Sequence, residues 1–255
     1  MTGMAARRFL IVALVFLVAV APSWAGTHFA GAPWVAELER FATRYHEDPP
    51  RLDKIRGRLG EAVKLDPRPE NLVALARVCF IWGDIRATTR DQKLEAYAEG
   101  REAAKRAIEL DPQNVAAHFW YGTNTGRWGQ AKGVVRSLFL LPTVQEEIQT
   151  VLTLDPTFTA VYSLAGHVYY EVPGLLGGDL NKAEEMFRKG LELDPKFTGM
   201  RVGLAKTLIK KGRTAEAQRE LEAVLGEPEP RNPADWTLKD SKEARLLLES
   251  IRGKS

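Results

Sequence analysis

Histidine and cysteine side chains supply many catalytic and metal sites, and this chain has few of either. The four histidines, His28, His46, His118 and His167, include no pair three or four residues apart, so no two share a helical face as metal ligands do. The sequence also has no His-Glu-x-x-His pair, no phosphate-binding Walker loop and no Gly-x-Ser-x-Gly elbow. We therefore expect no enzyme activity, no metal and no cofactor.

The one cysteine, Cys79, lies in the apolar helical stretch LVALARVCFIW. A single thiol cannot form an internal disulfide, so stability must come from packing. In this setting we expect Cys79 to be a small, buried apolar side chain rather than a reactive thiol. The glycine-rich stretch PGLLGG at 173–178 follows no strand and fits no dinucleotide fingerprint, so we interpret it as a loop that lets a helix pair bend.

The charge balance gives no electrostatic reason to expect nucleic acid as a partner. The chain has 36 Lys and Arg against 33 Asp and Glu, a net charge of +3. Two of the positive charges, Arg7 and Arg8, lie in the leader described next, which leaves the rest of the chain close to neutral.

The first 25 residues have the three parts of a secretory signal peptide. Arg7 and Arg8 precede the apolar run FLIVALVFLVAV at 9–20, and the small-x-small sequence SWA follows at 23–25. An apolar helix of this length spans about 18 Å, less than the ~30 Å hydrocarbon core of a bilayer. We expect cleavage after Ala25 and export to the periplasm; an uncleaved N-terminal anchor is the alternative. No cysteine lies near the cleavage site, which argues against lipid attachment there.

The sequence Leu-Asp-Pro occurs four times, with its prolines at Pro67, Pro112, Pro156 and Pro195. We expect the leucine to be the last core-facing residue of a helix, the aspartate to turn the chain, and the proline to prevent helix continuation. A joint that recurs every 39 to 45 residues indicates repeated helix pairs, because alternating strand patterns are nearly absent.

The residues between the joints resemble the tetratricopeptide (TPR) pattern of small residues where two helices cross and aromatic residues beside them. The third repeat carries it at Tyr162, Gly166, Tyr169, Ala183, Phe187, Gly190 and Pro195. The resemblance implies an all-α solenoid of antiparallel helix pairs. The first three repeats exceed the usual 34 residues, and we expect their surplus to lie between the two helices of each pair.

The predicted organisation is a signal peptide at 1–25, N-terminal capping helices within 26–70, four TPR-like repeats at 71–228, and a connector with a capping helix at 229–255. Helices are expected at 33–45 and 52–65 in the first cap. Asp240 and Glu243 have the spacing of a capping pair that would open the last helix.

Two further stretches, HFWYG at 118–122 and PGLLGG at 173–178, make the chain similar to the T-component family of tripartite ATP-independent (TRAP) transporters. The regulator of microtubule dynamics proteins share a related His-x-Trp-x-Gly stretch. The resemblance covers about residues 71–248. It implies a TPR protein that partners a periplasmic solute-binding protein, takes small organic acids or apolar ligands, and often forms homo-oligomers. Family members are often lipoproteins, and this chain has no lipidation cysteine at the predicted cleavage site.

By analogy with that family, the first helix of each repeat would line a concave binding face. Aromatic walls with a few cations suit an apolar ligand with a carboxylate, or the C-terminus of a peptide. For the aromatic residues the alternative is ordinary core packing, and for the histidine a solvated or hydrogen-bonded side chain. The candidate residues are Arg77, Phe80, Phe119, Trp120, Thr123, His167, Tyr170 and Lys206.

The run SLFLLP at 137–142 has four consecutive apolar residues, which favours burial on all sides. Either neighbouring segments of the chain cover it, or a second subunit or partner does. Two functions stay open at this point: an exported adaptor of the T-component kind, or a general scaffold of the cell envelope that handles no small ligand.

Overall fold

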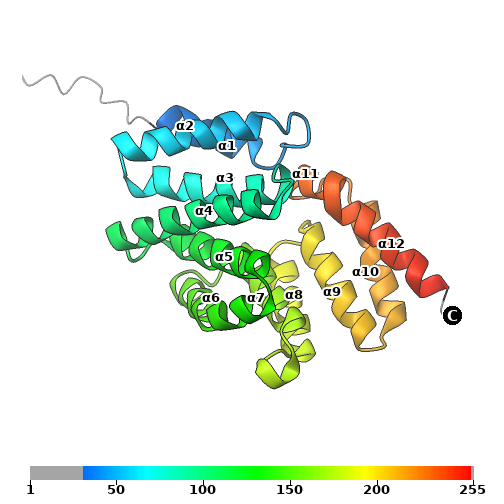
Figure 1. Ribbon diagram of the computed structural model, residues 1–255. Coiled ribbons are helices and arrows are strands. Elements are labelled where there is room, and N and C mark those ends of the chain that lie inside the picture. The colour runs from blue at the N-terminus through cyan, green and yellow to red at the C-terminus, as the bar shows by residue number, and fades with distance from the viewer. Residues whose placement is uncertain (1–30, 254–255) are drawn as a thin grey trace, which may run out of the picture.

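The structure is a computed structural model that describes residues 31–253, so the predicted signal peptide lies outside the described residues. Within that range every element is helical, which confirms the all-α prediction. Figure 1 shows pairs of antiparallel helices stacked one after another along the chain. No helix among residues 31–253 has the length and apolar character needed to cross a membrane.

The N-terminal cap consists of α1 (Ala32–Phe41) and α2 (Arg51–Leu65), and four helix pairs follow it. The pairs are α3 (Pro69–Ile85) with α4 (Arg90–Leu110), α5 (Val115–Lys132) with α6 (Val134–Leu154), α7 (Thr159–Glu171) with α8 (Leu180–Leu193), and α9 (Thr198–Lys210) with α10 (Thr214–Gly226). The short helix η1 (Gly174–Leu176) lies in the α7–α8 loop, and the chain ends with α11 (Pro233–Asp235), η2 (Trp236–Asp240) and α12 (Ser241–Arg252).

Each Leu-Asp-Pro ends the second helix of a pair or of the cap, as predicted. Asp111, Asp155 and Asp194 are the residues after the last turn, and each carboxylate accepts a hydrogen bond from the N–H two residues on, at 3.2, 2.8 and 3.1 Å. The intervening proline has no N–H to donate, so the hydrogen bond to the carboxylate spans the proline and closes the turn.

The expected core position of the leucine in these joints is wrong. Leu65, Leu110 and Leu193 are 80, 58 and 47 % exposed. The last buried residue of each of these helices comes two or three positions earlier, and with 3.6 residues per turn the final leucine rotates away from the neighbouring helices.

The extra residues of the first two repeats are helical rather than looped. Helices α4 and α6 have 21 residues each, against 14 in α8 and 13 in α10. Gly133, at φ +113°, is the single residue that joins α5 to α6, a backbone conformation that a side chain would strain. Only the third repeat keeps its surplus in a loop, around η1.

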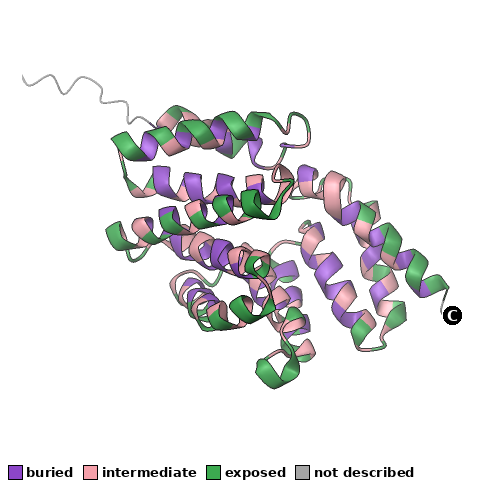
Figure 2. Ribbon diagram, viewed as in Figure 1, coloured by how far each residue is buried: buried purple, intermediate pink, exposed green. Residues whose placement is uncertain are grey.

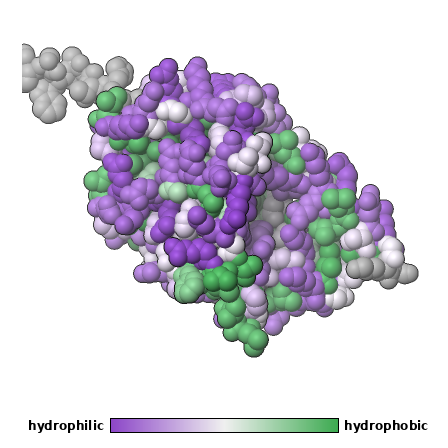
Figure 3. Space-filling view, viewed as in Figure 1, coloured by the Kyte–Doolittle hydropathy of each residue, from purple (hydrophilic) through white to green (hydrophobic). Residues whose placement is uncertain are grey.

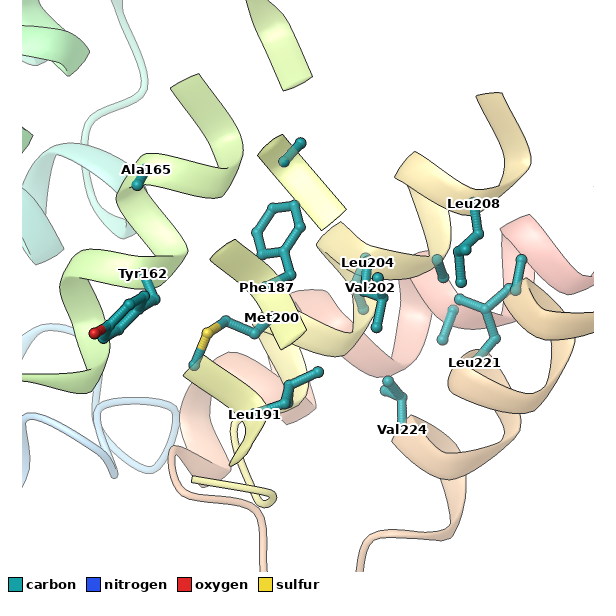
Figure 4. Close-up of a cluster of buried hydrophobic side chains, with 14 of the residues drawn as sticks. Tyr162, Ala165, Phe187, Leu191, Met200, Val202, Leu204, Leu208, Leu221 and Val224 are labelled. Carbon is teal, nitrogen blue, oxygen red and sulfur yellow. The ribbon is translucent and has the colours of Figure 1, made fainter. Parts of the chain in front are cut away.

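Two clusters of buried apolar side chains form the core, and α5 lies between them. The N-terminal cluster runs from Leu38 to Ala117 and includes Ala234; the C-terminal cluster runs from Phe119 to Ile251. Figure 2 shows the buried residues along the facing sides of the stacked helices, and Figure 4 shows Phe187 among its neighbours in the C-terminal cluster. Because Ala117 and Phe119 belong to different clusters, α5 joins the two halves of the solenoid.

Residues 231–240, which we call the C-terminal strap, return to the N-terminal cap (Figure 1). The Ala234 N–H donates to the carbonyl of Thr43 at 2.9 Å, and the Tyr45 hydroxyl donates to Asp235 at 2.5 Å. Ala234 is fully buried in the N-terminal cluster. The strap therefore connects the last repeat with the first helices across the inner side of the solenoid.

The predicted Asp240–Glu243 capping pair does not form. The Asp240 side chain makes no cap to α12; it accepts a hydrogen bond from the Thr198 hydroxyl at 2.7 Å. Glu243 pairs with Lys206 instead. Helix α12 continues directly from the π-helical turn η2, so its first N–H groups already have partners and need no side-chain cap.

Candidate partner-binding face

The first helices of three pairs carry partly buried aromatic side chains: Phe80 on α3, Trp120 on α5 and Tyr170 on α7. We call the surface around these three residues the inner face. The ring centroids of Phe80 on α3 and Trp120 on α5 lie 5.5 Å apart. Trp120 packs against both core clusters, so it marks the seam between them. The surface is hollowed between α5 and α9 in Figure 3. Two adjacent aromatic rings at such a seam are typical anchors for a binding partner.

An ion cluster around Asp84 borders this aromatic pair. Its carboxylate accepts hydrogen bonds from Arg127 and the Tyr97 hydroxyl, both at 2.6 Å, and Lys239 of the strap lies 3.4 Å away. The Arg127 guanidinium also lies 5.7 Å from the centroid of the Phe80 ring. Burial alone would raise the pKa of Asp84, but Arg127 and Lys239 outweigh it and lower that pKa. The cluster therefore forms a charged border beside the rings of Phe80 and Trp120.

A second group surrounds Tyr170 on α7. The Lys210 ammonium lies 3.6 Å from the centroid of the Tyr170 ring, and that of Lys206 lies 5.6 Å from it. Lys206 pairs with Glu243 of α12 at 2.9 Å. Burial alone would lower the pKa of Lys206, but the hydrogen bond and charge of Glu243 raise it. Lys210 has no acidic partner among residues 31–253, so it is a cation on this face that a partner can use.

His167 lies between these two groups and is a hydrogen-bonded, largely covered side chain. Its Nδ1 lies 2.8 Å from the carbonyl of Ser163, which can only accept, so Nδ1 carries the proton. Its ring packs edge-on against Phe187, with centroids 5.1 Å apart. Burial, with the nearby charges of Lys206 and Arg127, lowers the pKa of His167. The imidazole is therefore neutral at neutral pH.

Two of the candidate residues do not lie on the inner surface. Phe119 is buried in the C-terminal cluster, with its ring centroid 5.1 Å from that of Phe158, and Thr123 is buried as well. Residues 119 and 120 are adjacent on a helix and point about 100° apart, so Trp120 can be on the inner face only if Phe119 turns away from it. Arg77 is half-buried and forms a two-point ion pair with Glu39 of α1 at 2.8 and 2.9 Å.

The structure adds residues that the sequence did not single out. Asp84 and Lys210 follow Phe80 and Lys206 by four residues, and Arg127 follows Trp120 by seven, so one more helical turn in each candidate stripe would have found them. Lys239 and Glu243 come from the C-terminal segment, and no local pattern links them to α3 or α9.

Within residues 31–253 no three His, Cys, Asp or Glu side chains are grouped to hold a metal ion. The buried pair His118 and Glu147 is structural. Nδ1 of His118 lies 2.6 Å from a Glu147 oxygen, while its Nε2 donates to the carbonyl of Pro112 at 3.1 Å. This places the histidine of the HFWYG stretch between α6 and the Leu-Asp-Pro joint, away from the inner face.

Solved TPR structures share this architecture. A thermophilic TPR protein from Thermus thermophilus aligns with a TM-score of 0.61 at 20 % identity, over 86 % of this chain and 96 % of that one. PilF of Pseudomonas aeruginosa aligns with a TM-score of 0.54 at 15 % identity, over 89 % of this chain and 98 % of that one. These likenesses show the fold, and a TPR sequence pattern also matches residues 175–239. TPR folds of this kind are scaffolds that generally bind other proteins and carry no catalytic site.

Two regulator of microtubule dynamics proteins are similar to this chain. Regulator of microtubule dynamics protein 3 of Mus musculus is 23 % identical over 86 % of this chain, and that of Rattus norvegicus is 24 % identical over 68 % of it. The chain spans about half the length of these curated relatives, 53 and 42 %. The sequence pattern of the family described as regulator of microtubule dynamics protein 1-3 matches residues 42–176, just over half of the chain. The chain is therefore a TPR protein that belongs to the regulator of microtubule dynamics protein 1-3 family.

Proposed function

We propose that this chain is an exported, non-catalytic TPR adaptor that binds a partner protein on its inner face. The observation that carries the proposal is the Phe80–Trp120 pair at the seam of the two core clusters, with Arg127 of α5 over the Phe80 ring. Lys206 and Lys210 of α9 flank a further aromatic ring, that of Tyr170. The aromatic rings would anchor an apolar side chain of the partner, and Lys210 would pair with a carboxylate beside it.

Export rests on the predicted signal peptide at 1–25, ahead of capping helices, four repeats and a C-terminal cap. Fractionation of cells that produce the full chain would test it. A mature N-terminus at Gly26 in the periplasmic fraction is expected. A chain with an intact leader in the cytoplasmic fraction would contradict it.

The resemblance of HFWYG and PGLLGG to the T-component family supports a periplasmic solute-binding protein as the partner. A general envelope scaffold without such a partner is the alternative. The microtubule role in the name of the curated relatives is not part of this proposal, because the chain spans only about half of their length.

A small organic acid or apolar ligand is a second candidate for the same face, since an aromatic wall next to Lys206 and Lys210 suits a carboxylate on an apolar body. Native mass spectrometry of the purified chain separates the two possibilities. A retained small molecule supports a ligand-handling adaptor. Protein partners alone support the scaffold.

Two variants test the inner face directly. Trp120→Leu keeps an apolar side chain but removes the ring, and Lys210→Glu reverses an exposed charge. Each should weaken capture of a solute-binding protein at least about tenfold, the loss typical of a central interface residue. Lys64→Glu on α2, an exposed lysine away from the face, is the matched control and should leave capture unchanged. Unchanged capture by both inner-face variants would refute the assignment.

A further inference from the structure

Five of the exposed apolar side chains of residues 31–253 come from the start of α6 and from η1. Val134, Val135 and Phe139, in the first two turns of α6, are 75, 71 and 75 % exposed. Leu175 and Leu176 of η1 are also exposed, and a Cβ at the neighbouring Gly177 would lie 4.0 Å from Nε2 of Gln145 on α6. Figure 3 shows hydrophobic surface gathered at this end of the molecule. We call these five residues the apolar tip.

The α6 part of the apolar tip is confined to the start of that helix. Positions 135, 139 and 142 form one outward stripe with Val135, Phe139 and Pro142, and the same stripe continues as Glu146 and Gln149. Ser137, Leu138, Leu140 and Leu141 of the SLFLLP run are half-buried. Neighbouring helices therefore cover part of the run but leave Phe139 and Pro142 to solvent. A stripe that is apolar only near the helix start indicates a local contact rather than one along the whole helix.

Cations without acidic partners border the apolar tip. The charged groups of Arg101, Lys132 and Arg136 lie 5.8, 5.3 and 5.4 Å from the Trp128 ring centroid. None of the three has an ion pair among residues 31–253, whereas arginines such as Arg56 and Arg213 elsewhere in this range do. No acidic residue occurs between Asp111 and Glu146. The surface beside the apolar tip therefore carries uncompensated positive charge.

We propose that the apolar tip and these cations dock the protein on the surface of a lipid bilayer that contains anionic lipids. The apolar side chains would enter the boundary between headgroups and acyl chains, and Lys132 and Arg136 would contact the anionic headgroups. Each cation at such a surface strengthens binding by roughly fivefold. This surface is separate from the inner face, so docking leaves the proposed partner site free.

A second copy of the chain fits this surface less well. In a two-fold contact the same patch meets itself, so Lys132 and Arg136 of both copies would come together without an acid between them. Anionic headgroups offer the opposite charge. In addition, Leu175 is fully exposed in a loop that protrudes from the helix pairs, a shape suited to insertion rather than to a flat interface between proteins.

The buried Cys79 makes a site-specific test practical, because a cysteine added at the surface is the reactive one. In the full-length Phe139→Cys variant, an environment-sensitive fluorophore is attached to the new cysteine at the apolar tip. Leu246→Cys, at an exposed leucine of α12, is the matched control. Both are mixed with vesicles of phosphatidylcholine alone, or with phosphatidylglycerol as about one lipid in three.

The expected result is a rise and blue shift of fluorescence at position 139 with the anionic vesicles only, and none at position 246. Because the label reports its own site, insertion of the N-terminal apolar run cannot produce this difference. Lys132→Glu with Arg136→Glu in the labelled chain should weaken the apparent affinity at least about tenfold. No change at position 139, or the same change at 246, would overturn the proposal. Excimer formation by a pyrene at 139 without vesicles would overturn it in favour of a second copy.

Discussion

Nδ1 of His118 on α5 lies 2.6 Å from Oε2 of Glu147 on α6, and both side chains are buried. A Cβ at Gly122, one helical turn after His118, would come within 3.0 Å of the Glu147 Cβ. The histidine and the glycine of the HFWYG stretch therefore serve one purpose: they hold α5 and α6 close together. Burial raises the pKa of Glu147, and the His118 hydrogen bond opposes that rise.

Removing one side chain of the His118–Glu147 pair should destabilise the folded protein. His118→Ala leaves Glu147 buried without its hydrogen bond and should lower the free energy of unfolding by about 2–4 kcal/mol, measured by urea denaturation at neutral pH. Adding Glu147→Gln in the same chain should recover part of the loss, since a neutral amide is cheaper to bury than a carboxylate. Additive effects of the two substitutions would show that the two side chains are not coupled.

The helix crossings of the third and fourth repeats depend on glycines that face Phe187. A Cβ at Gly166 on α7 would lie 2.5 Å from this fully buried ring, and one at Gly203 on α9 would lie 2.6 Å from it. Gly166→Ala should therefore lower the free energy of unfolding by about 1–3 kcal/mol, because the packed ring must move.

Gly57 in α2 is the control for this prediction, because a Cβ there would meet nothing within 4 Å. Gly57→Ala should raise the free energy of unfolding by about 0.5–1 kcal/mol through helix propensity alone. The two changes in the free energy of unfolding, measured by urea denaturation, are expected to have opposite signs. A stable Gly166→Ala variant would mean that Phe187 has room to shift.

The repeat architecture could be predicted from the sequence because its signals are local. Proline cannot continue a helix, and an aspartate before it turns the chain within three residues. The exposure of Leu65 and Leu110 could not be predicted in the same way, since it depends on how each helix is rotated against its neighbours at its last turn. The extra residues of the first two repeats were expected in loops, yet they favour longer helices such as α4, which begins with a Thr89–Gln92 capping box.

The candidate face could be predicted only in part, because it depends on helix rotation and on contacts distant in sequence. Phe119 and Trp120 have similar side chains, and only the packing of α5 between two clusters decides which of them is buried. Lys239 meets Asp84 across 155 residues of sequence. No periodicity encodes that contact, because it arises when the strap returns to the N-terminal cap.

The network around Glu184 on α8 gives an acid-sensitive contribution to stability. Lys211, Arg213 and Arg188 lie 2.6, 2.7 and 2.8 Å from its carboxylate. Gly212, at φ +74°, forms the turn that lets the first two cations flank it. Burial would raise the pKa of Glu184, but these hydrogen bonds and charges lower it to about 2.

Because the pKa of Glu184 is lower in the folded state than its ordinary value of 4.5, its contribution is present above that value and is lost as the pH falls toward 2. Wild type should exceed Glu184→Gln in the free energy of unfolding by on the order of 3 kcal/mol at pH 7. The difference should shrink steadily between about pH 4.5 and pH 2. A difference that is constant with pH would mean that the carboxylate charge is not the stabilising feature.

Asp240, the last residue of the strap, should respond to pH in the opposite sense. Burial raises its pKa from 3.8 to about 6, although the Thr198 hydroxyl donates to it and Lys239 attracts it; Asp235 and Glu243 add to the rise. Since the folded state holds the proton more tightly, the stabilisation is complete below about pH 4 and is lost as the pH rises through 6. Asp240→Asn mimics the protonated acid and keeps an acceptor for Thr198, so its stability should not fall in this range. The gap between variant and wild type should therefore grow by on the order of 3 kcal/mol between pH 4 and pH 7.5, measured by urea denaturation.

Thr198→Val removes the hydrogen bond that lowers this pKa and should move the midpoint of the loss to higher pH. Parallel profiles for wild type and Asp240→Asn would show that this carboxyl group is already solvated where the strap meets α12.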